Sequence, residues 1–218
     1  MAESSPNLAL IILLVATVGL LPLIIVTMTG FLKISVVLFL IRNALGVQQT
    51  PPNLVLYGIA LILASYVTAP LIGEIGYQFQ DTQIQLNSVQ DLKDIAERVR
   101  VPLQAHLAKY ATLEEREFFL NATDGLWSEQ ARHNLKDDDL VVLVPAFVGS
   151  ELARAFEIGF LLYIPFLIID LIVSNLLMAM GMMMVSPTLI SVPLKIFLFV
   201  AVDGWSKLMH GLISSYGG

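Results

Sequence analysis

The chain has 218 residues, a formal net charge of −6 and no cysteine; 56% of its residues are hydrophobic and only 14% are charged. A typical soluble domain carries about 25% charged residues, so this composition excludes a disordered protein, a coiled coil, a basic nucleic-acid binder and an ordinary soluble globule. The lack of cysteine also excludes disulfides, iron–sulfur clusters and thiolate zinc sites.

The charges are concentrated in one segment. Residues 81–140 contain 7 basic and 12 acidic residues, whereas the rest of the chain contains only 5 basic and 6 acidic ones. About 20 apolar helical residues are enough to cross the hydrocarbon core of a bilayer, and three uncharged runs exceed that length. These runs have 29, 31 and 24 residues and lie between Glu3 and Lys33, between Arg42 and Glu74, and between Asp170 and Lys195.

The first part of the chain is expected to form a helical hairpin. Leu8 to Arg42 is predicted to be an apolar helix that bends at Pro22, because proline removes a helical hydrogen bond. Asn43 to Asn53 contains glycine and a pair of prolines, which predict a connection. Leu54 to Tyr77 is predicted to be a second apolar helix with a kink at Pro70.

The rest of the chain begins with the charged segment, Gln78 to Asp139, which is predicted to be mainly helical. Leu140 to Met184 is apolar, Val185 to Val192 is a short loop, and Pro193 to Ser214 is a last helix. The expected fold is all-α, with membrane-type helical hairpins and a polar insert. Its regions are an N-terminal hairpin over 1–80, an acidic insert over 81–139 and a C-terminal apolar region over 140–218.

The first apolar run is expected to be retained in the protein. It lacks the basic n-region and the small-residue cleavage site of a signal peptide. The connection that follows carries Arg42, with Lys33 nearby, and no acidic residue, which favours the cytoplasm for this loop. The acidic insert is then expected on the opposite side of the membrane.

The sequence offers little enzymatic chemistry. The three histidines lack metal-site spacing, and no P-loop, dinucleotide fingerprint or GxSxG elbow occurs; neither a metal nor another cofactor is expected. Asp170 and Asp203 are the only carboxylates after Glu157. They could form a protease dyad or a proton path, or cap and pair locally. The last is favoured, because Asp203 and Lys207 stand four residues apart with the acid first.

Other charges lie in apolar surroundings. At 1.5 Å per helical residue, Lys33 lies about 14 Å and Glu74 about 30 Å from the connection between the first two helices. The two charges are therefore at different depths and cannot pair within one chain. A partner for Lys33 is expected in another subunit or in water at a helix end. Glu151, Arg154 and Glu157 are spaced three apart and share one face of a helix. This stripe is either a solvated face or a charged seam between subunits.

Five of the eight methionines lie within seven residues: Met178, Met180, Met182, Met183 and Met184. They could simply pack in a helix core, since methionine fills irregular gaps. However, three consecutive side chains leave a helix in three directions, and one helix face cannot bury them all. A loop pushed into a narrow ring could use all three as a deformable seal.

Several contiguous motifs resemble the FliP/SctR family. They extend over almost the whole chain outside the insert: residues 42–49, 51–53, 145–160, 165–170, 175–187 and 203–205. The second of the long motifs, residues 175–187, ends in Met-Met-Met-Val-Ser-Pro. The end of the chain at Tyr216-Gly217-Gly218 resembles the injectisome branch of the family more than the flagellar branch.

The resemblance implies a non-enzymatic, virulence-related subunit of the type III secretion export gate in the bacterial inner membrane. It implies five copies in a helical ring with T-type and S-type subunits, further export-apparatus and needle or rod components, and unfolded secreted proteins that pass through the centre. Met182, Met183 and Met184 would form the pore gasket. Much of the chain would be raised to periplasmic level, with apolar helices buried against other subunits.

Two alternatives to the export gate come from the charged residues. An ion-coupled transporter subunit would use Asp170, Lys33 and Asp203 as a relay, but no internal repeat is visible. An intramembrane aspartyl enzyme would use Asp170 and Asp203, but no motif flanks either residue. In the export gate, the expected subunit-interface charges are Glu151, Arg154, Glu157, Lys33, Asp170 and Asp203.

Overall fold

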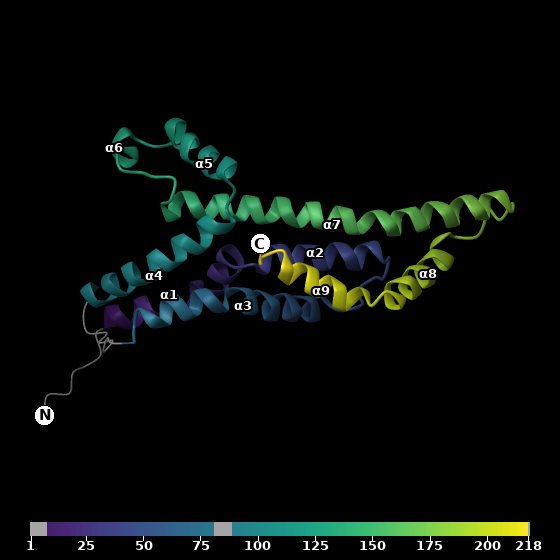
Figure 1. The fold of residues 1–218 in the computed structure, drawn as a ribbon, viewed down its shortest axis with the longest axis horizontal. Helices are drawn as coiled ribbons and strands as arrows, with labels where there is room; N and C mark the ends of the chain where they lie inside the picture. Colours follow the sequence, from purple (N-terminus) through teal and green to yellow (C-terminus); the bar gives the residue numbers. More distant parts are fainter. Residues whose placement is uncertain (1–7, 81–88, 218) are drawn as a thin grey trace, which may run out of the picture. The chain divides into compact units, whose positions relative to one another are not determined.

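The computed structural model describes residues 8–80 and 89–217, and within these ranges the chain forms α-helices joined by turns, without β-strands (Figure 1). The all-α fold expected from the sequence is therefore confirmed. The helices are α1 (Leu8–Met28), α2 (Phe31–Ala44), α3 (Asn53–Tyr77), α4 (Val89–Tyr110), α5 (Leu113–Leu126), α6 (Glu129–Arg132), α7 (Leu140–Ala179), α8 (Thr188–Ala201) and α9 (Gly204–Ser214).

The chain divides into two compact units, each made of two segments. Unit 1 comprises Met1–Thr29 and Thr68–Glu151, and unit 2 comprises Gly30–Val67 and Leu152–Gly218. The acidic insert belongs to unit 1, and the methionine run belongs to unit 2. The polar insert is helical, as expected, because α4, α5 and α6 account for most of its described residues.

Unit 1 has a small apolar core between α4 and the start of α7. Leu107 and Ala111 of α4 pack with Leu143, Ala146 and Phe147 of α7, and all five are buried. The spacing of each set places its members on one helical face. This core fixes the insert against the first turns of α7.

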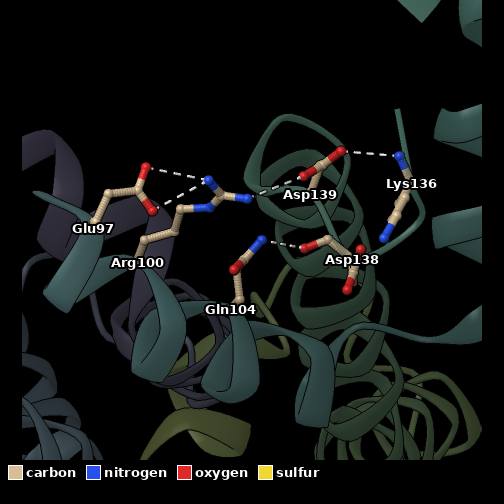
Figure 2. Close-up of polar contacts among 6 residues, drawn as sticks. All are labelled: Glu97, Arg100, Gln104, Lys136, Asp138 and Asp139. Atoms are coloured by element: carbon tan, nitrogen blue, oxygen red, sulfur yellow. Dashed lines mark hydrogen bonds and ion pairs between the residues drawn. The ribbon is translucent and has the colours of Figure 1, made fainter. Parts of the chain in front are cut away.

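Polar contacts continue the same junction at the surface of unit 1 (Figure 2). The Arg100 guanidinium lies 3.3 Å from Glu97 and 3.6 Å from Asp139, which directly precedes α7. Gln104 donates to the backbone carbonyl of Asp138 at 2.8 Å. The Lys136 backbone N–H donates to the Asp139 carboxylate at 2.9 Å. The Asp139 carboxylate therefore joins α4 to the connection that precedes α7, at the point where α7 begins.

Helix α5 begins with a capping arrangement. Thr112 is the N-cap residue and accepts a hydrogen bond from the backbone N–H of Glu115, while Glu114 and Glu115 place acid in the first turn. Threonine followed three residues later by glutamate is the capping-box pattern, and acid here also opposes the positive end of the helix dipole. The sequence thus determines where this helix starts.

Unit 2 is built around α2. The buried apolar residues of α2 are spaced three and four apart and form one stripe along the helix: Ile34, Val37, Leu38 and Ile41. Helix α7 approaches α2 closely at Gly159, where a Cβ atom would collide with the side chain of Leu40. In Figure 1, α9 runs beside α2, and α8 joins the end of α7 through a short loop.

The first expected helix is broken at a different place from the one predicted. Pro22 lies inside α1, and the break falls at Thr29 and Gly30 before α2 starts. The chain passes close to Tyr216 at this break, because a Cβ added at Gly30 would come within 2.6 Å of the Tyr216 hydroxyl. The prediction of a single helix from Leu8 to Arg42 was therefore wrong, because this stretch forms two helices.

The last expected helix is also interrupted. Helix α8 already begins at Thr188, so the loop is shorter than predicted, and α8 and α9 are bent by 63° at Val202 and Asp203. Asp203 has the left-handed φ of 53° and ends the regular path, while Gly204 leaves room for the Phe199 ring. Sequence patterns did not reveal this break because both flanks are apolar.

Two helices, Asn53–Tyr77 and Leu140–Ala179, are long and apolar enough to cross a membrane, among the residues that the structure describes. The number rises to four if each of two bent helix pairs forms one span. Pro145 and Pro165 lie inside Leu140–Ala179 without ending it. The uncharged run between Arg42 and Glu74 thus corresponds to the long helix α3, whereas the run between Asp170 and Lys195 is divided between the end of α7, the turn and the start of α8.

Candidate functional site

The methionine run lies at the end of α7, where the backbone leaves the helix sharply. Gly181 has a φ of +74°, and its N–H bonds to the Met178 carbonyl at 3.0 Å. The N–H of Met182 bonds to the Leu177 carbonyl at 2.9 Å. This pair of bonds around a left-handed glycine is the Schellman motif. It stops α7 and starts a turn.

The turn presents its methionines outward. A bond of 3.2 Å from the Val185 N–H to the Met182 carbonyl closes it, and Pro187 then caps α8. The exposed fractions are 43% for Met182, 83% for Met183 and 101% for Met184. Of the two alternatives left open by the sequence, the structure has the loop, and Met183 and Met184 are not packed within the chain.

An ion pair joins α7 and α8, the two helices on either side of this turn. The ammonium of Lys195 in α8 lies 2.5 Å from the Asp170 carboxylate in α7. It also donates to the Ala44 carbonyl at 3.0 Å, at the C-terminal end of α2, where carbonyls lack helical partners. Lys195 is only 4% exposed. Sequence reasoning missed Lys195, although a lone lysine in an apolar run was a visible signal.

Asp170 has a partner within its own chain, as favoured from the sequence, whereas the expected Asp203–Lys207 pair is not found in the part of the chain that the structure describes. Asp170 pairs with Lys195 of its own chain, so its charge is already matched without a second subunit. Asp203 forms no ion pair with Lys207 among the described residues; only the backbone of Lys207 bonds to the Asp203 carbonyl. The left-handed backbone at Asp203 starts α9 too abruptly for the regular i,i+4 geometry.

Lys33 also differs from expectation. Its side chain is 1% exposed, and its ammonium lies 3.4 Å from the centroid of the Tyr216 ring. A cation over an aromatic face is favourable, and more so when it is desolvated. The Tyr216 hydroxyl donates to the Gly30 carbonyl at 3.3 Å. Lys33 therefore has an aromatic partner within its own chain, and its role at a subunit interface stays a prediction.

The charged stripe of α7 is graded in burial. Glu151 is fully buried, Arg154 is half-buried and Glu157 is exposed. Glu157 stands beside two exposed aromatic side chains, Phe156 and Phe160. Only the Glu157 end of the charged stripe is therefore fully available to another molecule.

Unit 1 contains two polar residues whose role the sequence did not reveal. Ser150 of α7 accepts from the Thr112 N–H at 2.9 Å and donates to the Ala146 carbonyl at 2.8 Å. It joins the start of α5 to α7. His106 of α4 stacks edge-on with Tyr110, at 5.1 Å between centroids.

The surroundings of His106 lower its pKa from the ordinary 6.5. Burial is the main cause, and the nearby Lys109 charge acts in the same direction, against the opposing charges of Glu151 and Glu74. The protonated imidazolium is therefore disfavoured in the folded chain.

Unit 2 also holds a cavity of about 660 Å³ among α2, α7, α8 and α9. Its walls are mainly apolar and include Ile41, Phe166, Leu198, Phe199, Leu208 and Leu212. Within the described residues, no three or more histidine or acidic side chains gather in a way that could hold a metal ion. The geometry offers an exposed methionine turn on a hairpin that is braced by the Lys195–Asp170 ion pair.

Comparisons with known proteins match nearly the whole chain. The profile of the FliP family matches residues 14–212. The chain is 52% identical to "Probable translocation protein y4yL" of Sinorhizobium fredii, over 99% of this chain and 97% of that protein. It is 47% identical to "Yop proteins translocation protein R" of Yersinia pestis, over 95% and 96% of the two chains. It is 42% identical to "Virulence protein YscR" of Salmonella typhimurium, over 91% and 92%.

Proposed function

The chain belongs to the FliP family, and we propose that it serves type III secretion as a core subunit of the export apparatus, with its methionine turn as part of the channel seal. The secretion role rests on relatives of nearly equal length that are named for translocation and virulence. Nothing in these relatives supports the ion-coupled transporter. The helices that are long and apolar enough to cross a membrane support a multi-pass subunit of the inner membrane.

The finer proposal concerns the channel. Copies of the chain, five in the family picture, assemble with T-type and S-type subunits and with needle or rod components around a central path for unfolded proteins. In this arrangement the gate is raised toward periplasmic level. Apolar helix faces then pack against neighbouring subunits, which are as apolar a surrounding as lipid.

The observation that carries the seal is the outward projection of Met183 and Met184 from a braced turn. An isolated chain gains nothing from exposing two large apolar side chains. Methionine is unbranched and soft, so several such turns can close a constriction and still give way to diverse passing chains. A thioether also lacks a charge or a strong donor that would retain a polypeptide.

The proposal is tested by truncating the turn in Met182→Ala/Met183→Ala/Met184→Ala. Loss of the long thioethers should raise ion leakage through the resting export complex at least severalfold, while the complex still assembles. Membrane conductance of cells carrying the variant is the measurement, with assembly followed on native gels. A variant with normal assembly and wild-type conductance would contradict the seal.

A matched control removes the same kind of surface elsewhere. Leu113, Phe118 and Leu126 of the insert are exposed apolar side chains that lie outside the turn. Replacing these three with alanine should leave conductance at the wild-type level. Equal leakage in both triple variants would mean that general loss of apolar surface, and not the turn, opens the membrane.

A further inference from the structure

The cavity of unit 2 reaches the surface of the chain and carries a charge there. Two of its lining residues, Leu161 and Leu198, are 61% and 39% exposed. Lys207 of α9 also lines the cavity and is exposed, and it is the one charged residue among the lining residues that the structure describes. An apolar hollow with a cation at its edge is complementary to a protein surface that combines apolar side chains with an acid.

Helix α7 presents such a surface within the same unit. Phe156 and Phe160 stand four residues apart, and Glu157 stands three residues before Phe160, so the three side chains are neighbours on the helix. The two rings are 55% and 66% exposed in the single chain, and Glu157 is exposed beside them. We call these three residues the α7 ridge. Exposed aromatic side chains are frequent anchors of protein interfaces.

The α7 ridge and the cavity face different directions. Ile158, Leu162 and Phe166 line the cavity, and their spacing of four residues places them on one face of α7. At 3.6 residues per turn, Phe156 and Phe160 lie about 160° around the helix from Ile158. The ridge therefore cannot enter the cavity of its own chain. A contact between ridge and cavity joins two copies head to tail, which is the kind of interface that can close into a ring.

We propose that the α7 ridge of one copy enters the unit 2 cavity of a neighbouring copy, where Glu157 pairs with the neighbouring copy's Lys207. This inference rests on the proposed assembly of several copies. Among the described residues, neither Glu157 nor Lys207 has an ion-pair partner in its own chain. The contact matches both charges at once. The apolar surroundings also lower the local dielectric constant, which strengthens the attraction between the two groups.

The first experiment identifies the contact by a crosslink without a spacer. The detergent-purified export complex is treated with a carbodiimide, which joins a carboxylate to an ammonium group that touches it. A covalent dimer of this chain should appear on denaturing gels. Its trypsin digest should contain residues 155–195 joined to residues 196–218, because coupled Lys207 is no longer a cleavage site. Fragment sequencing should place the bond between Glu157 and Lys207.

Two conservative variants make this crosslink specific. Glu157→Gln should remove the dimer, whereas Glu117→Gln, which changes an exposed acid of the insert, should leave it unchanged. Absence of the bond in an intact wild-type complex, or the same dimer in Glu157→Gln, would overturn the proposal. Coupling of Lys207 to a different subunit would also overturn it, because another protein would then occupy the cavity.

The second experiment exchanges the charges. Glu157→Lys and Lys207→Glu each bring like charges together and should lower the yield of oligomer on native gels severalfold. The double variant restores opposite charges and should recover a yield close to the wild type. The matched control, Glu117→Lys with Lys207→Glu, should stay as low as Lys207→Glu alone. A double variant with the wild-type melting temperature that assembles no better than the single variants would overturn the proposal.

Failure of this contact is distinguishable from failure of the proposed function. If secretion requires the chain and the complex assembles, but neither the crosslink nor the recovery is observed, the export role stands and the ridge-in-cavity contact is wrong. If the chain is neither found in a complex nor required for secretion, the proposed function is wrong as well.

Discussion

Lys195 joins three helices of unit 2 through one ammonium group, which contacts Asp170 of α7 and the Ala44 carbonyl of α2. The residues between Asp170 and Lys195 include the whole methionine turn. The ion pair therefore lies at the base of the hairpin that carries the turn. Its two charges differ in burial, since the side chain of Lys195 is 4% exposed and that of Asp170 is 40% exposed.

This difference predicts unequal costs for the two single substitutions. Asp170→Asn leaves a buried ammonium without its counter-charge and should cost about 3 kcal/mol, because unpaired buried charges are strongly destabilising. Lys195→Met leaves a half-exposed carboxylate, which water can solvate, and should cost about 1–2 kcal/mol. Denaturant titration of the purified full chain measures both, and the opposite order would contradict this account.

His106 predicts a pH dependence of stability. Its pKa is lowered in the folded chain, so between that value and 6.5 the unfolded chain binds more protons. The stability that this histidine contributes is complete above pH 6.5 and is lost as pH falls through the lowered pKa. His106→Phe keeps an aromatic ring beside Tyr110 and should flatten the fall in melting temperature below pH 6.5. If the melting temperatures of the wild type and of His106→Phe fall in parallel below pH 6.5, His106 does not cause the loss of stability.

At the scale of elements, Gly181 decides where α7 ends. Its φ of +74° is costly for residues with a Cβ atom, and nothing lies within 4 Å of the place where a Cβ would be. Any effect of substitution is thus conformational and not steric.

We expect Gly181→Ala to destabilise the turn by about 1 kcal/mol and to raise resting conductance. Asparagine tolerates the left-handed conformation better than alanine. Gly181→Asn is therefore the matched control and should raise conductance less. Conductance measurements on cells with each variant test this order, and identical behaviour of the two variants would mean that the turn geometry does not govern the seal.

Local sequence signals predicted the helices better than their interruptions. The uncharged run between Arg42 and Glu74 predicted α3, and the apolar stretch from Leu140 predicted α7. The break at Gly30 lies against Tyr216, which is 186 residues away along the chain and comes there only through folding. For the same reason, the contacts of Lys33 and Lys195 could not be paired from spacing along the chain.

At the scale of the whole molecule, the surface of α7 in unit 2 combines many exposed apolar side chains with one exposed acid. Glu157 lies between Phe156 and Phe160, which are exposed too. A charge facing the centre of a bilayer costs about 2.5–3.5 kcal/mol on insertion scales. A neighbouring subunit that supplies a cation or hydrogen-bond donors removes this cost. The surface around Glu157 is therefore better explained as an interface between subunits than as a lipid-facing surface.

This argument predicts that Glu157→Lys lowers the yield of the assembled complex. Reversal of the charge makes an attraction across the interface repulsive, whereas an exposed side chain contributes little to the fold of the single chain. Native gels should show less oligomer, and the melting temperature of the isolated chain should stay close to that of the wild type. Glu117→Lys reverses an exposed acid of the insert and should leave assembly unchanged. If Glu157→Lys assembles as well as this control, Glu157 faces water and the interface lies elsewhere on α7.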